Sequence, residues 1–198
     1  GQMGVEAGAV FEQLRRLSAR LVQSPQCAVA MRELAAAVEA LSPLRLGLTL
    51  PTADRLEGRV PSPVVYAHLA DAATMHASVF GFVKENDAIP LHDHPRMHGF
   101  IRVLRGSLKV TSFSRAASGR LRFEGAKEIG VADGCVQLEP DSCNVHEVRA
   151  LEAGSFFFDL LVPGYKEVVC SYYRSPPNAP QVGEECELER CRTPPTYF

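Results

Sequence analysis

Hydrophobic residues recur at helical spacing along the first forty or so positions of the chain. One stripe predicts a helix from about residue 6 to 22, and a second stripe continues to about Leu41. The Ser-Pro pair at 24–25 supplies an N-cap and a first-turn proline, and the Ser-Pro pair at 42–43 ends the second helix. The two stripes consist of Val10, Phe11, Leu14, Leu17 and Leu21, and of Cys27, Met31, Leu34, Val38 and Leu41.

The pattern changes from about residue 63 to short, β-prone segments in which apolar and polar residues often alternate. Glycine, proline, aspartate and asparagine separate them. Regularly spaced short strands without intervening helices predict a mainly β fold, either an antiparallel barrel or a double-sheet jelly roll. The clearest segments are 76–83, 99–104, 107–113, 135–138, 146–149 and 155–161.

These patterns divide the chain into a helical appendage, residues 1–45, and a β domain, residues 46–198. We expect the appendage to pack on the domain, although a basic amphipathic start is also compatible with a transit peptide or a partner-binding helix. The C-terminal end is rich in proline and charge and predicts a tail that wraps over the surface.

Composition narrows the class of protein. The net charge of −2 and the pI near 6.3 argue against binding to nucleic acid or to an anionic membrane. No apolar run approaches a membrane span, and no signal peptide opens the chain. The six cysteines form no CxxC pair, which favours reduced thiols. We therefore expect a monomer in the cytoplasm, with a nuclear location also open.

Three histidines carry the most specific chemical prediction. His92 and His94 are two residues apart, so on a strand both rings would point to the same face. Pro90 and Pro95 bracket them, as suits a strand end or bulge. His146 lies in a later segment that could face them. Three imidazoles suit iron, zinc, copper or nickel.

The same histidines resemble the two metal-binding motifs of cupins, which implies a cupin-type double-stranded β-helix barrel. Gly99 stands where the usual glutamate ligand of the first motif would be. Three neutral ligands leave the charge of Fe(II) uncompensated, and a substrate thiolate is a natural anionic partner for such a centre. Up to three octahedral positions would remain open to a thiolate, an amine and O2.

Four blocks of sequence also resemble the cysteamine dioxygenase and plant cysteine oxidase family of thiol dioxygenases. They occur in consistent order over about residues 60 to 190, at 89–99, 144–146, 158–163 with Tyr165, and 170–174. The resemblance implies one Fe(II) per chain, held by the three histidines, and addition of both atoms of O2 to a thiol to give a sulfinic acid. The implied substrates are cysteamine or the N-terminal cysteine of peptides and proteins, and in the latter role the enzyme would act as an oxygen sensor.

Three further residues are candidates for catalysis. Asp159 interrupts an apolar strand, and an acid there needs a partner, so it could orient a ligand histidine, bind the substrate amine, or form an ordinary salt bridge. Cys170 and Tyr172 share a face if they lie on a strand. The family resemblance points to this pair as the one that forms a thioether in some thiol dioxygenases; otherwise they are core residues. Tyr172 could also hydrogen-bond a bound oxygen species.

Tyr66, Arg96 and Tyr165 are candidates for substrate binding, with pocket-lining roles for the tyrosines and a peptide contact for the arginine. His98 follows His94 by four residues, but the family resemblance makes it a non-ligand. We expect His68 and His76 to be surface or core residues.

Two other functions remain open from the sequence. A zinc cupin could act as a hydrolase or isomerase, since three histidines with an open position suit zinc-activated water. A non-catalytic cupin could bind a ligand or partner, with the N-terminal helices as the docking element. The amino-acid sequence does not choose among cysteamine, free cysteine and Cys-initiated peptides.

Overall fold

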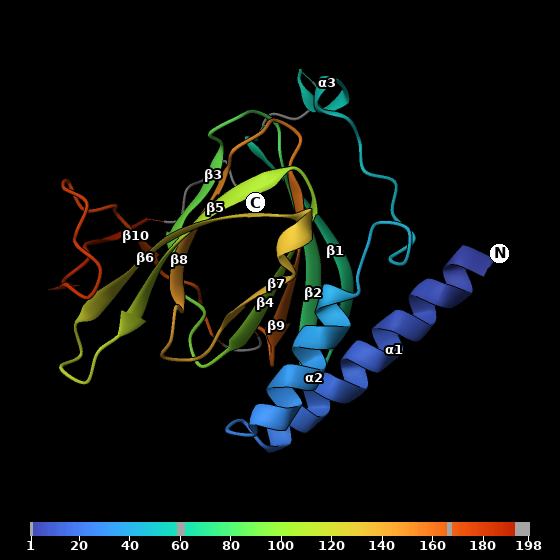
Figure 1. Cartoon of the computed structure of the whole chain (residues 1–198), viewed down its shortest axis with the longest axis horizontal. Coiled ribbons are helices and arrows are strands. Elements are labelled where there is room, and N and C mark those ends of the chain that lie inside the picture. Colours follow the sequence, from blue (N-terminus) through green and yellow to red (C-terminus); the bar gives the residue numbers. More distant parts are fainter. Residues whose placement is uncertain (1, 59–61, 166–167, 193–198) are drawn as a thin grey trace.

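The computed structural model describes residues 2–58, 62–165 and 168–192, and consists of two facing β-sheets with a helical hairpin on one side (Figure 1). Helices α1 (Gln2–Gln23), α2 (Ala28–Glu39) and the short α3 (Ala53–Leu56) precede all the strands. The strands, with one 3-10 turn η1 (Val131–Asp133), are β1 (Val64–Ala72), β2 (Met75–Phe82), β3 (Ala88–His92), β4 (His98–Arg105), β5 (Ser107–Arg115), β6 (Leu121–Gly130), β7 (Cys135–Leu138), β8 (Val145–Ala150), β9 (Phe156–Val162), β10 (Tyr172–Tyr173), β11 (Glu185–Cys186) and β12 (Arg190–Cys191).

The strands form one sheet in the order β1-β2-β9-β4-β7 and another in the order β11-β6-β5-β8-β3-β10-β12. Every pairing between neighbouring strands is antiparallel. The chain passes repeatedly from one sheet to the other, which is the arrangement of a double-stranded β-helix. The mainly β prediction is therefore confirmed.

Two layers of apolar side chains hold the molecule together. Between the sheets lies a cluster that includes Phe82, Ile101 and Phe157. On the other face of the five-stranded sheet, Phe100 and Phe158 pack with the buried stripes of α1 and α2, so the helices cover that face. All six cysteines are free. No helix in the described part of the chain is long and apolar enough to cross a membrane.

Alternation along β9 decides which residues reach the interior of the barrel. Phe157 belongs to the cluster between the sheets, whereas Phe158 and Leu160 belong to the cluster under the helices. Because successive strand residues point to opposite faces, Asp159 faces the opposite sheet.

One end of the barrel gathers several chain segments far apart in sequence. Strand pairing brings Ala72 opposite Met75 at the end of β1 and the start of β2. The same kind of pairing sets His92 opposite His146, and His98 opposite Val162. The ends of β1, β3 and β9 therefore meet the starts of β2, β4 and β8, and we call this the open end.

Some local predictions were wrong. The N-cap of α2 is Cys27 and not Ser24, because the amide of Ser24 still donates to the Arg20 carbonyl and residues 24–26 form the turn between the helices. Strands β1 and β6 and helix α3 were not predicted. Strand β1 is half-exposed and β6 carries many charged residues, so neither has the apolar alternation that marked the other strands.

The C-terminal region adds two short edge strands to the larger sheet. Strand β11 pairs with β6, and β12 pairs with β10. These strands belong to the segment for which the sequence predicted a surface-wrapping tail. Residues 193–198 of that tail lie outside the described residues.

Candidate metal centre

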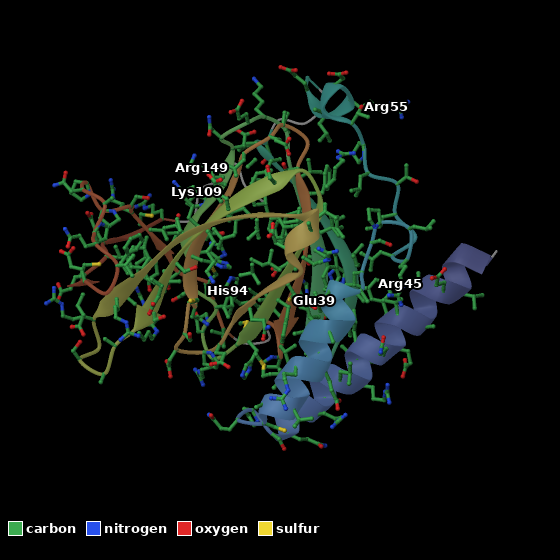
Figure 2. The ribbon with its side chains drawn as sticks, viewed as in Figure 1. Glu39, Arg45, Arg55, His94, Lys109 and Arg149 are labelled. Carbon is green, nitrogen blue, oxygen red and sulfur yellow. The ribbon has the colours of Figure 1, made fainter. Side chains whose placement is uncertain are left out.

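The rings of His92, His94 and His146 converge near the open end of the barrel. One nitrogen from each lies within 4.8 Å of the others, and Nε2 of His94 is 3.0 Å from Nε2 of His146. All three side chains are buried, with 7%, 4% and 3% of their surface exposed. Figure 2 shows His94 in the space between the two sheets. The three predicted ligands therefore form one cluster.

The local backbone that achieves this differs from the one predicted. Strand β3 ends at His92, and His94 lies in the turn that follows, where Met97 N–H donates to the His94 carbonyl. Strand alternation therefore does not explain why the two rings meet. The pairing of β3 with β8 shifts register between Ile89 and His92, so His92 points to the same inner face as Ile89. The turn after β3 then returns His94 to His92.

Hydrogen bonds to Nδ1 orient two of the rings. His92 Nδ1 lies 2.7 Å from the Pro90 carbonyl oxygen, which can only accept, so Nδ1 carries the proton. Tyr165 Oη lies 2.5 Å from His94 Nδ1 and donates to the Asp93 carbonyl at 2.9 Å. Since its one proton goes to that carbonyl, the phenol accepts from His94 Nδ1–H. Both rings therefore present the lone pair of Nε2 to the cluster.

The donor set fits a transition metal. Burial lowers the pKa of His92, and lowers the pKa of His94 and His146 well below the usual value, so the rings are neutral as metal ligands must be. Nε2 of His146 lies 3.0 Å from the unprotonated Nε2 of His94, which is close enough for both nitrogens to coordinate one cation. Imidazoles that are held by hydrogen bonds at the other ring nitrogen are typical of protein metal sites.

No carboxylate joins the three histidines in the described part of the chain. Gly99, at the position of the cupin glutamate, is paired with Leu138 across β4 and β7. A Cβ at Gly99 would lie 2.8 Å from Leu138 Cγ, which is closer than real contacts allow. The leucine therefore fills the space that an acidic side chain would need.

Asp93, between two ligands, ties the metal-binding turn to the C-terminal segment. Its buried carboxylate accepts from Ser171 N–H at 2.7 Å and from Tyr173 Oη at 3.2 Å. Arg115 lies 3.5 Å from the same carboxylate. The sequence analysis missed this role. The signal was present, since Asp93 lies between two predicted ligands in a segment bracketed by prolines.

Asn144 fixes the turn from the other side. Its amide nitrogen donates to the carbonyls of His94, Met97 and Glu139, and its side-chain oxygen accepts from His94 N–H at 2.9 Å. Asn144 is fully enclosed and satisfies four backbone bonds at once, so it holds the ligand turn against β8.

The sequence also matches a known family. A model of the PCO_ADO family matches residues 33–194. The chain belongs to the PCO_ADO family. The match includes all three histidines and most of the C-terminal segment, but not α1.

Curated relatives of this PCO_ADO protein agree with that assignment. It is 29% identical over 159 residues to 2-aminoethanethiol dioxygenase of Mus musculus, covering 65% of this chain and 62% of the mouse protein. The Homo sapiens 2-aminoethanethiol dioxygenase is also 29% identical, over 142 residues, with 57% of this chain and 52% of the human protein covered. The chain thus spans between half and two thirds of the length of these relatives.

Among solved structures, an uncharacterized conserved protein with a double-stranded β-helix domain from Klebsiella pneumoniae subsp. pneumoniae is similar at a TM-score of 0.44 and 14% identity. The similarity covers 62% of this chain and 88% of that protein.

The structure of this PCO_ADO protein brings Tyr165, Cys170 and Tyr172 to the metal centre, and Asp159 is near enough to Tyr165 to raise its pKa. The Tyr172 ring lies 5.7 Å from that of His92, and the Cys170 thiol contacts the hydroxyl groups of Tyr165 and Tyr172. Cys170 precedes β10 and is not on a strand, so its proximity to Tyr172 comes from the turn before β10. Burial raises the pKa of the Cys170 thiol to about 11 and raises that of Tyr165 as well.

Asp159 is a buried acid without a basic partner in the described residues. It stands between Ser78 on β2 and Ile101 on β4, and is 8% exposed. No hydrogen bond or ion pair joins its carboxylate to the described part of the chain, and burial raises its pKa to about 7. The salt-bridge alternative weighed for this residue therefore has no support among those residues.

The remaining candidates lie farther out. Tyr66 is 42% exposed and lies on the edge strand β1, opposite Phe80 of β2. Arg96 is exposed, in a turn with φ of 60°, and its predicted contact with a peptide stays a prediction. His98 lies on the outer face of β4 near the Pro25 carbonyl, away from the cluster, which agrees with its assignment as a non-ligand.

Proposed function

We propose that this member of the PCO_ADO family is an Fe(II)-dependent thiol dioxygenase that converts R–SH and O2 into R–SO2H. The substrates are Cys-initiated peptides or proteins, and cysteamine. Both oxygen atoms enter the product, and the sulfur supplies all four electrons, so no external reductant is consumed. The observation that carries the proposal is the cluster of three neutral histidines with an unpaired buried carboxylate, Asp159, on the facing sheet.

Iron, when bound by His92, His94 and His146, supplies the one-electron and O2 chemistry that amino-acid side chains lack. Three neutral ligands favour an anionic substrate group, and a thiolate is such a group. The name of the curated relatives, 2-aminoethanethiol dioxygenase, supports an aminothiol as substrate.

Asp159 has the properties required to bind the substrate amine. A buried carboxylate without a partner gains most from a cation that enters with the substrate, because the pair then forms away from water. An ammonium group at Asp159 would hold the thiol, two carbon atoms away, toward the histidine cluster. The same arrangement explains why both cysteamine and an N-terminal cysteine would fit, since each has a free amine beside its thiol-bearing carbon.

Tyr165 and Tyr172 supply hydroxyl groups next to the reacting atoms. Tyr165 also fixes the ring of His94, so its phenol has a positioning role. The contact between the Cys170 thiol and the Tyr172 hydroxyl group brings the sulfur to the side of the ring whose carbon, next to the hydroxyl, a thioether would join. A mass 2 Da below that of the unmodified chain, about the loss of two hydrogen atoms on forming an aryl thioether, would reveal that bond.

The proposed function is tested with apo-protein that is loaded anaerobically with Fe(II) and then exposed to ¹⁸O2. We expect cysteamine or a Cys-initiated peptide to gain two labelled oxygen atoms, measured by mass spectrometry. Zinc-loaded protein is the matched control and should give no product. Hydrolysis or isomerisation by the zinc form, or label-free product, would contradict the proposal.

We also propose that the peptide reaction serves oxygen sensing, and that the protein acts as a monomer in the cytoplasm or nucleus. The dependence of the initial rate on O2 concentration tests the first part. Light scattering after size-exclusion chromatography and microscopy of tagged protein test the second.

A further inference from the structure

A second polar cluster lies on the inner face of β1 and β2 and consists of Tyr66, His76 and Ser78. Tyr66 Oη lies 3.1 Å from His76 Nε2, Ser78 Oγ lies 3.0 Å from the same nitrogen, and Ser78 Oγ donates to Tyr66 Oη at 3.2 Å. Asp71 Oδ1 lies 3.7 Å from His76 Nδ1 and orients the ring from the other side. None of these groups belongs to the metal centre.

The cluster lies next to Asp159, whose carboxylate we propose binds the substrate amine. Ser78 is the register partner of Asp159, and directly opposed residues of an antiparallel pair have Cβ atoms about 5 Å apart. Ser78 alternates with Phe80, which stacks on Phe157 between the sheets, so both residues point inward. His76 lies two residues before Ser78 on β2, so it points to the same face and is closer to the open end.

The exposed fraction of the side chains increases along the row formed by Ser78, His76 and Tyr66. Ser78 is 1% exposed, the His76 side chain 28%, and Tyr66 42%. The three side chains therefore extend from Ser78, the buried register partner of Asp159, to the more exposed His76 and to Tyr66 on the edge strand β1. A molecule whose amine is held at Asp159 and which continues beyond the first residue would pass along these three side chains.

We propose that Tyr66, His76 and Ser78 bind the first peptide group of a Cys-initiated substrate, and so favour peptides over cysteamine. This inference rests on the proposed function. A peptide group offers a neutral carbonyl acceptor and a neutral N–H donor, and hydroxyl and imidazole groups can pair with both. Cysteamine lacks that group altogether. Free cysteine has a carboxylate there, and the carboxylates of Asp159 and Asp71 on either side of the row disfavour a third negative charge.

The test compares kcat/KM for a Cys-initiated tetrapeptide with kcat/KM for cysteamine. Tyr66→Phe and His76→Ala should each lower the peptide-to-cysteamine ratio by about 3- to 10-fold, the range for loss of a hydrogen bond to a neutral group. Most of the change should appear in KM. Anaerobic calorimetry of the peptide should show a matching rise in Kd. Lys84→Ala, at an exposed position in the bend after β2, is the control and should leave the ratio unchanged.

A tetrapeptide with its first carbonyl reduced to methylene provides a second reference. It should be a poorer substrate for the wild-type protein, and Tyr66→Phe should affect it less than the normal peptide. An equal loss for peptide and cysteamine in both variants, or an unchanged ratio, would overturn the inference. So would a wild-type protein that oxidises cysteamine but no peptide. If the wild-type protein oxidises neither thiol, the proposed function itself fails.

Discussion

The phenol of Tyr165 lies 2.5 Å from Nδ1 of His94, although the two residues are 71 positions apart in the chain. The contact joins the segment after β9 to the metal-binding turn. It also decides which nitrogen of His94 is available to a metal, since the phenol donates its own proton to the Asp93 carbonyl. A residue suggested only as pocket-lining by the sequence is therefore a direct support of the metal centre.

Replacing Tyr165 should weaken metal binding. Tyr165→Phe removes the acceptor for His94 Nδ1–H, and loss of such a supporting group costs about 10- to 100-fold in metal affinity. Competition with a chromophoric chelator measures the Fe(II) affinity. Tyr66→Phe removes a hydroxyl group outside the metal centre and should keep the wild-type affinity; a similar loss in both variants would contradict the assignment.

The two histidines at 94 and 98 should behave differently on substitution. After loading with Fe(II), His94→Ala lacks one of the three proposed ligands, and its iron content after desalting should fall from the proposed one per chain to background. His98→Gln should retain one iron per chain, because its ring lies on the outer face of β4 near Pro25. Elemental analysis measures both. Retention of iron by His94→Ala would show that the cluster is not the metal site.

Asp159 should make the metal-free protein less stable as pH rises. Its pKa is raised from 3.8 to about 7, so between these values the folded state keeps a proton that the unfolded state has released. The free energy of unfolding therefore decreases as pH increases through that window and levels off above it. Asp159→Asn should lack this decrease and be more stable than wild type at pH 8 by about 1–3 kcal/mol.

Urea denaturation at several pH values measures the effect in chelator-treated protein. Glu152→Gln, at an exposed position, is a matched control and should follow the wild-type curve. A parallel pH dependence in wild type and Asp159→Asn would mean that another group is responsible.

Gly99 and Leu138 should be energetically coupled. Gly99→Ala places a Cβ 2.8 Å from Leu138 Cγ and should destabilise the protein by about 1–3 kcal/mol through overpacking. Leu138→Ala should cost about 2–4 kcal/mol by leaving a cavity. The double variant should lose less than the sum, since the new methyl group occupies part of that cavity.

Urea denaturation of the wild type, the two single variants and the double variant gives four free energies of unfolding. Their differences give the coupling energy between positions 99 and 138. Additive losses would show that Leu138 does not fill the space beside Gly99. The cycle thus tests why this cupin lacks a glutamate ligand.

Periodicity in the sequence was sufficient for the elements with a strong apolar signal. Helices α1 and α2 were predicted within a few residues, because each buries a continuous stripe against the sheet. Strands β4, β5 and β9 were predicted because each carries several apolar residues that are buried in the sheet. Strand β1 was missed since its exposed polar residues are satisfied by the solvent at the edge of the sheet, and edge position is not encoded in local alternation.

The amino-acid sequence by itself determined which chemical groups are present: two imidazoles between prolines and a third at position 146, no glutamate at position 99, and one acid in an apolar strand. Only the tertiary structure decided how these groups are used. His94 reaches His92 through a turn held by Asn144, and Tyr165 and Asp93 connect that turn to a segment far along the chain. Such contacts depend on strand register and on the space left by neighbours, which are properties of the packed molecule, whereas residue chemistry and periodicity are local.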